Sequence, residues 1–281
     1  MRLPSKSIAT DENLIRQDIC ETIDASLVKI TPSALEKHFF QKYGLSKKHI
    51  KYLIRDLIVK GELTYSYQYG CTFLERSFNR PVRISQYVVI KPPGRQYDAY
   101  PDDVIIQILP GASFGIGDHP TTRLAVRGIE HAIRRGVYCS EHNKKICLDV
   151  GTGSGILVIA AVKFGIKNGI GIDVDPCARA EARGNVRING LQKQIQISGQ
   201  SADTLEHRFW MITANLRYPS LIQLCPLFSG LIDPEGLVIL SGIKFEEFAG
   251  LIKVYTDASF VCLWREIEKG WVGVAFKNSK K

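Results

Sequence analysis

The chain has 281 residues, of which 45% are hydrophobic and 23% charged, an ordinary composition for a folded protein that excludes wholesale disorder. The longest clearly apolar run, residues 156–162, is too short to cross a bilayer, and the first residues lack the apolar core of a secretory signal. Seven cysteines without a C-x-x-C pair suggest neither a disulfide framework nor a zinc site. We therefore expect a cytoplasmic protein with no bound metal and no membrane partner.

Positive charge is concentrated in the first third of the chain. The 37 Lys and Arg residues exceed the 28 Asp and Glu residues by nine, and residues 1–100, with 16 basic and 10 acidic residues, hold six of that excess. Such a bias fits a nucleic acid or another acidic surface as a partner. It fits equally well a mild excess of charge that keeps a protein soluble.

Residues 1–75 predict a small domain that begins with three helices. Apolar residues recur at helical spacing in residues 11–27, which gives that segment one apolar face. Two further helices are expected over residues 31–44 and 46–61. Each begins at a Thr or Ser that can cap a helix and ends at a Gly that can stop one.

A β-hairpin is expected directly after these helices. Residues 63–69 and 71–74 are rich in Tyr, Thr and Phe and flank a glycine turn. Three helices and a hairpin form the outline of a winged helix, in which the third helix enters the DNA major groove. Protein docking and dimerisation use the same scaffold, so both interpretations stay open. The polar side of the third helix carries Lys47, Lys48 and Lys51.

The rest of the chain predicts a second, α/β domain. Residues 76–103 are expected to form a connector with one strand at 83–90, and residues 104–281 the domain itself. Strands that alternate with helices indicate βαβ units and a parallel sheet covered on both faces. Strands are expected at 104–109, 146–150, 168–174, 209–214 and 237–241, with helices at 155–164 and 175–189.

A glycine-rich turn follows the second strand of this domain. The run Leu-Asp-Val-Gly-Thr-Gly-Ser-Gly-Ile-Leu at 148–157 places glycines where a strand passes into a helix, at the sheet edge where open α/β folds bind ligands. The third glycine comes one residue earlier than in the dinucleotide fingerprint. This spacing is seen in Rossmann-like S-adenosylmethionine methyltransferases, whose cofactor has no pyrophosphate.

Two polar residues follow later strands of the same domain. Asp173 ends the next strand, where its two oxygens can accept the hydroxyls of a ribose. Asn215 ends the strand predicted at 209–214. Each residue alone has a structural explanation, as a turn or a helix cap, but together and in this order they favour a methyltransferase over a dinucleotide enzyme.

The segment at 110–122 resembles a known family signature. It matches P-G-x-x-F-G-x-G-x-H-P-T-T of the PrmA-type methyltransferases, which modify lysine and terminal amines of a ribosomal protein of the large subunit. The resemblance implies a Rossmann-like class I methyltransferase domain that uses S-adenosylmethionine, with a protein as substrate. It covers roughly residues 81–281 and continues through GIDVDP at 171–176, N-x-x-x-N-G-L at 185–191, ANL at 214–216, LSGI at 240–243 and Trp-Val at 271–272.

The resemblance also implies roles for individual residues. Asn215 is the expected catalytic residue, because its side-chain oxygen and neighbouring carbonyls can accept the hydrogens of an amine and orient its lone pair. A free lysine has a pKa near 10.4, and burial beside a positive sulfonium favours the neutral amine, so no dedicated general base is needed. The residues expected to contact the cofactor are Phe114, Gly115, Thr122, Gly151, Gly153, Gly155, Asp173 and Asn215.

His119 allows two interpretations, and the sequence departs from the family pattern in several places. A catalytic His119 would remove a proton, but we favour a structural role at the start of a helix. Residues 1–75 do not resemble the small α/β domain with which PrmA binds its substrate. Arg217–Tyr218 replace small apolar residues of the family, and Asp118 replaces a common Thr. A nucleic-acid methyltransferase is an alternative. Enzymes that methylate exocyclic base amines, however, typically have Pro-Pro-Tyr or Pro-Pro-Phe after this Asn, and this chain does not. A DNA-binding regulator that senses S-adenosylmethionine is a second alternative.

Overall fold

The chain divides into two compact units, Met1–Arg80 and Pro81–Lys281. The computed structural model describes residues 12–68, 70–109, 117, 119–134 and 145–279. The boundary differs from the one predicted after residue 75. Residues 81–103, predicted as a connector, belong to the second unit. No helix in these described ranges is long and apolar enough to span a membrane.

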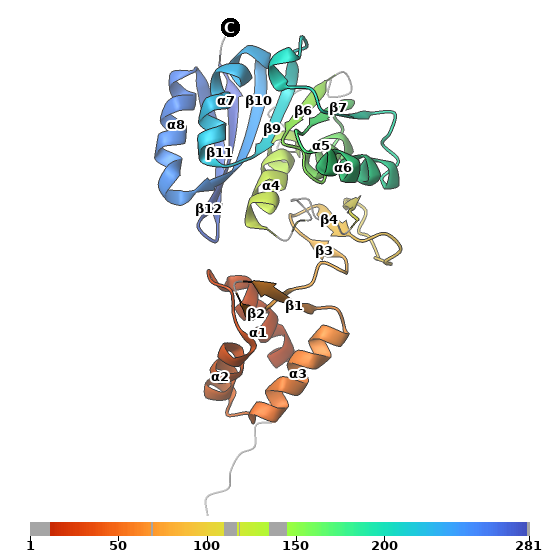
Figure 1. Ribbon diagram of the computed structural model, residues 1–281, viewed down its shortest axis with the longest axis vertical. Coiled ribbons are helices and arrows are strands. Elements are labelled where there is room, and N and C mark those ends of the chain that lie inside the picture. Colours follow the sequence, from red (N-terminus) through yellow and green to blue (C-terminus); the bar gives the residue numbers. More distant parts are fainter. Residues whose placement is uncertain (1–11, 69, 110–116, 118, 135–144, 280–281) are drawn as a thin grey trace, which may run out of the picture. The chain divides into compact units, whose positions relative to one another are not determined.

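The first unit consists of three helices followed by a β-hairpin, as the sequence predicts (Figure 1). Thr31 and Ser46 cap the second and third helices, because their hydroxyls accept the backbone N–H groups of Ala34 and His49 at 3.2 Å each. The elements are α1 (Glu12–Ala25), α2 (Pro32–Tyr43), α3 (Lys47–Val59), β1 (Leu63–Gln68) and β2 (Cys71–Arg76).

This unit has its own hydrophobic core. Its three helices and both strands contribute side chains that are almost completely buried, and burying each one stabilises the fold by about 1.5–3 kcal/mol before entropy is subtracted. The unit is therefore a domain in the energetic sense, with apolar contacts of its own. The core includes Ile15, Ile19, Leu35, Phe39, Ile50, Leu53, Leu57, Leu63 and Leu74.

A seven-stranded sheet forms the centre of the second unit, in the order β11-β12-β10-β9-β6-β7-β8. Strand β12 runs antiparallel to both of its neighbours, and the pairs from β10 to β8 are parallel. The sheet confirms the predicted α/β class. The strands are β6 (Ile146–Val150), β7 (Asn168–Ile172), β8 (Ile195–Ser198), β9 (Phe209–Asn215), β10 (Ile232–Lys244), β11 (Phe260–Glu268) and β12 (Trp271–Asn278).

Helices cover both faces of this sheet. One layer contains α4, α5 and α6, which contact one another in sequence, and the other contains α7 and α8 (Figure 1). The apolar core under α7 and α8 takes its side chains from alternate positions of the strands, such as Val238 and Leu240 of β10. The helices are α4 (Pro120–Arg134), α5 (Ile156–Lys163), α6 (Pro176–Ile188), α7 (Tyr218–Leu231) and α8 (Phe248–Asp257).

A small three-stranded sheet precedes α4, in the order β3-β4-β5. The single strand predicted at 83–90 is wrong, because the chain turns between β3 (Val82–Arg83) and β4 (Val88–Lys91). The buried carboxylate of Glu130 on α4 accepts hydrogen bonds from the Ser85 hydroxyl and the Tyr87 N–H and so holds this turn. The third strand is β5 (Val104–Gln107), which runs parallel to β4.

Candidate active site

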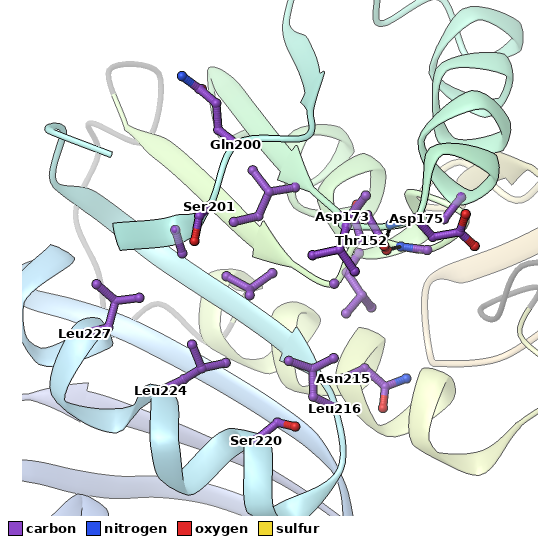
Figure 2. A pocket seen from close by; sticks show the side chains of 18 of the residues that line it. Thr152, Asp173, Asp175, Gln200, Ser201, Asn215, Leu216, Ser220, Leu224 and Leu227 are labelled. Atoms are coloured by element: carbon purple, nitrogen blue, oxygen red, sulfur yellow. Dashed lines mark hydrogen bonds between the residues drawn. The ribbon is translucent and has the colours of Figure 1, made fainter. Parts of the chain in front are cut away.

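A cavity of about 850 Å³ opens at the carboxyl ends of β6, β7 and β9. Parallel strands end at one edge of the sheet, so the chain segments that leave them meet there. The structure accordingly brings Gly151, Asp173 and Asn215 to the same cavity. Figure 2 shows Ser220, Leu224 and Leu227 of α7 along one side, with Asp173 and Asp175 on the other.

The glycine turn alternates between ordinary and left-handed backbone. Gly151, Gly153 and Gly155 have φ angles of 71°, 53° and 82°, a conformation that costs other residues roughly 1–2 kcal/mol each. Gly151 and Gly153 line the cavity, whereas Gly155 precedes the first residue of α5 and faces Ala182 of α6. The structure thus places Gly155 in the packing behind the turn.

Backbone amides hold the Asp173 carboxylate in the cavity. Its Oδ2 accepts the N–H of Gly153 and its Oδ1 that of Asp175, both at 2.9 Å. Each oxygen keeps a further acceptor position, which suits two neighbouring hydroxyls. Val174 follows Asp173 and also lines the cavity. It is 92% exposed, so an apolar ring bound in the cavity could cover its side chain. Asp175, not Asp173, caps the next helix, accepting the Cys177 N–H at 2.8 Å.

Asn215 lies at the end of β9, opposite Thr122 of α4. Its Nδ2 is 3.5 Å from the Thr122 hydroxyl, a long contact that leaves the amide oxygen as the acceptor for a ligand. Thr122 is fully buried, so the amide approaches a fixed group.

His119 stands at the start of α4, where Nδ1 is 2.8 Å from the Thr121 hydroxyl and accepts the Thr121 N–H at 3.3 Å. Its ring meets the ring of Trp271 edge-on, with 5.2 Å between centroids. This geometry supports the structural role favoured from the sequence. Phe114, Gly115 and Asp118 lie outside the described residues.

The LSGI stretch of β10 supports the segment that follows Asn215. Ser241 O accepts the N–H of Leu216 at 3.1 Å, and Gly242 has a φ of 90°. A Cβ at Gly242 would lie 2.2 Å from Leu216 O, far inside van der Waals contact. Only glycine therefore allows this approach of the two backbones.

Tyr218 does not line the cavity. It is the first residue of α7, and its hydroxyl packs so closely on Gly250 of α8 that a Cβ there would be 2.4 Å away. Its place in the structure is therefore a helix start. The side of the cavity nearest to it is instead lined by Leu216, Ser220, Leu224 and Leu227.

Asp149 is a buried acid to which sequence reasoning gave no role. It lies on β6 with no exposed surface, and its carboxylate accepts the hydroxyls of Thr152 and Thr213 at 2.7 Å each. Burial raises the pKa of Asp149 to about 6, against the effect of these hydrogen bonds. An acid inside the otherwise apolar strand Ile-Cys-Leu-Asp-Val was the available signal.

We expect stability to fall as pH rises through the range that ionises Asp149. The unfolded chain loses this proton near pH 4 and the folded chain near pH 6, so between these values the folded state binds more protons. The free energy of unfolding therefore falls by up to about 3 kcal/mol as the pH rises through this range. Urea unfolding of wild type and Asp149→Asn at pH 4.5 and pH 8 measures it. The stability of Asp149→Asn relative to wild type should be greater at pH 8 than at pH 4.5. An equal pH dependence of stability in both proteins would contradict the raised pKa of Asp149.

No group of three His, Cys, Asp or Glu side chains within the described ranges could hold a metal ion. The site instead consists of a glycine turn, a carboxylate and an amide at the carboxyl edge of a parallel sheet. Together with the antiparallel β12 inserted between β10 and β11, these features define a class I methyltransferase domain with a Rossmann-like fold.

The family of ribosomal protein L11 methyltransferases, PrmA, matches residues 75–279, and the chain belongs to this family. The ribosomal protein L11 methyltransferase of Pelotomaculum thermopropionicum is 34% identical over 204 residues, which cover 71% of this chain and 63% of that protein. The enzyme of the same name from Geobacter sp. strain M21 is 35% identical over 202 residues, 71% of this chain and 64% of its own length. The chain thus spans just under two thirds of the length of these curated relatives.

A solved structure agrees with this placement. The crystal structure of ribosomal protein L11 methylase from Lactobacillus delbrueckii subsp. bulgaricus superposes with a TM-score of 0.63 at 30% identity, covering 72% of this chain and all of that one. The family match begins at residue 75, close to the boundary between the two units. The first unit therefore lies almost entirely outside the family match.

Proposed function

We propose that this protein is an S-adenosylmethionine-dependent methyltransferase that modifies lysine or another amine of a ribosomal protein. The observation that carries the proposal is the cavity in which Gly151, Asp173 and Asn215 meet, within the segment that matches the PrmA family. The relatives are named ribosomal protein L11 methyltransferases, so L11 is the first methyl acceptor to test.

The residues of the cavity fit the cofactor. Asp173 presents two fixed oxygens to the ribose hydroxyls, and Val174 offers an apolar side chain to the adenine. Gly151, Gly153 and Thr122 would border the methionine part, and we retain Phe114 and Gly115 as further contacts. When bound, the cofactor supplies an electrophilic methyl group on a positively charged sulfur.

The acceptor amine must reach this methyl group uncharged and aligned. Leu216, Leu224 and Leu227 make that side of the cavity apolar, which excludes water and disfavours the ammonium form. The Asn215 oxygen would accept an N–H of the amine and turn its lone pair toward the methyl group. A base is then unnecessary, because the amine loses its proton to solvent before it enters.

A radiolabelled-methyl assay tests this function. The full-length protein is incubated with tritiated S-adenosylmethionine and either purified ribosomal protein L11 or a cell extract of its host, each treated with protease or nuclease afterwards. We expect protease-sensitive label on a lysine or a terminal amine. Nuclease-sensitive label, or none with either acceptor, would overturn the proposal.

The first unit supplies a second, separate proposal, that its helix α3 binds nucleic acid. Every acidic residue of the unit from Glu12 to Glu75 pairs with a neighbouring side chain. Lys47, Lys48 and Arg55 of α3 are exposed and, among the described residues, have no ion pair or hydrogen bond. Lys37 of α2 is a fourth exposed cation of this kind, so most of the uncompensated charge in the described part of the unit lies on α3, as binding to a phosphate backbone requires.

A matched pair of variants tests the α3 surface. Replacing Lys47, Lys48 and Arg55 with Ala removes the unpaired charges, and replacing Lys29, Lys42 and Lys60 removes as many paired ones from the same unit. Binding is measured with labelled DNA and RNA duplexes at several salt concentrations. We expect only the first variant to bind about tenfold more weakly, with a slope of log affinity against log salt concentration that is smaller by about 2–3. Equal losses, or no binding by wild type at low salt, would exclude nucleic acid as the partner.

We also propose that the protein acts in the cytoplasm. Its seven cysteines follow no pattern typical of oxidising compartments, and three of those described, Cys20, Cys147 and Cys225, are buried thiols.

A further inference from the structure

Asn185 of α6 and Asn189, which directly follows this helix, make hydrogen bonds that the proposed chemistry does not explain. Asn185 and Asn189 stand four residues apart in the N-x-x-x-N-G-L stretch, so they share one face of the helix or its end. Neither residue lines the cavity. Both use their side-chain amides on backbone groups of other segments.

Asn185 joins the glycine turn to the end of the small sheet. Its Nδ2 donates to the carbonyl of Ser154 at 2.8 Å, and its Oδ1 accepts the N–H of Leu109 at 2.9 Å. Ser154 lies between Gly153 and Gly155, and Leu109 immediately precedes the signature at 110–122. Asn185 and Ser154 are each 1% exposed, so water does not compete for the bond between them, whereas the bond to Leu109 is partly buried.

Asn189 has a simpler role. Its Oδ1 accepts the N–H of Gln107 at 3.0 Å, and its Nδ2 donates to Gln107 O at 2.7 Å, as a neighbouring strand would. Both asparagines therefore fasten the end of β5 to α6. Only Asn185 also reaches the turn that borders the cavity.

We propose that Asn185 is a positioning residue for the cofactor site. It fixes Ser154 of the glycine turn and Leu109 at one distance from each other, although it does not line the cavity itself. A side-chain amide suits this position because one group must donate to a carbonyl while the other accepts an N–H. The proposal rests on the proposed function, since it concerns the affinity of the same site.

The two asparagines provide matched variants. We expect Asn185→Ala and Asn189→Ala both to lower the urea midpoint, because each removes buried or partly buried hydrogen bonds. Isothermal calorimetry with S-adenosylhomocysteine should show at least tenfold weaker binding for Asn185→Ala and less than twofold for Asn189→Ala. Equal weakening in both, or wild-type affinity in folded Asn185→Ala, would overturn the role.

A second pair of variants keeps the side-chain volume, so that no cavity forms, and changes the donor group. Asn185→Asp keeps an acceptor for Leu109 and loses the donor to Ser154, whereas Asn189→Asp makes the corresponding change away from the turn. We expect weaker binding only for Asn185→Asp. If wild type itself does not bind S-adenosylhomocysteine, the proposed function fails; if it binds and both Asp variants match it, only the role of Asn185 fails.

Discussion

Replacing Asp173 with Ala should reduce the affinity for S-adenosylhomocysteine at least a hundredfold. The carboxylate would accept both ribose hydroxyls, and hydrogen bonds to a charged group contribute about 1.5–3 kcal/mol each. The variant also leaves the N–H groups of Gly153 and Asp175 without their acceptor. Isothermal calorimetry on wild type and Asp173→Ala measures the loss directly.

Asp175→Ala is the control for this experiment. Asp175 also lines the cavity, but its carboxylate caps α6, so its loss should cost about 1 kcal/mol of stability and change the affinity less than about threefold. Wild-type affinity in folded Asp173→Ala would refute the assignment of the ribose site.

Replacing Asn215 with Ala should lower kcat about a hundredfold or more, the usual cost of losing one fixed polar group at a reacting centre. The binding of S-adenosylhomocysteine should change only a few-fold, because Asp173 and the glycine turn remain. Initial rates with tritiated S-adenosylmethionine, at saturating cofactor and acceptor, separate the two effects.

Asn215→Asp distinguishes orientation of the amine from mere occupancy of the position. A carboxylate there still accepts an N–H, but its charge raises the pKa of the acceptor amine and favours the ammonium form. The rate should therefore be low at neutral pH and rise more steeply with pH than that of wild type. A flat profile, or a parallel loss of cofactor binding, would count against the role of Asn215.

Much of the fold followed from signals that lie within a few residues of each other. Thr31 and Ser46 begin helices because a hydroxyl caps the next turn, and Gly151 breaks the strand before it. The turn at Ser85 did not follow, since its partner Glu130 is 45 residues away in sequence. A local pattern contains no information about that distant carboxylate.

Some residues of the site could be predicted from the sequence and others could not. Asp173 and Asn215 were predictable because polar residues at the ends of parallel strands must share one sheet edge. Leu224 and Leu227 were not, because apolar residues on a helix read as core until the structure shows them facing a cavity. Asp149 was visible in the sequence, but its meaning depends on burial and on the hydroxyl of Thr213 from another strand.

The contact between Gly242 and the chain after Asn215 restricts how this domain can diversify. Even the smallest mutational step from glycine would place a carbon atom 2.2 Å from Leu216 O. Substitutions that change which methyl acceptor is bound must therefore lie outside this contact. Arg217 is exposed and next in the chain, so a change of its side chain leaves the contact between Gly242 and Leu216 in place.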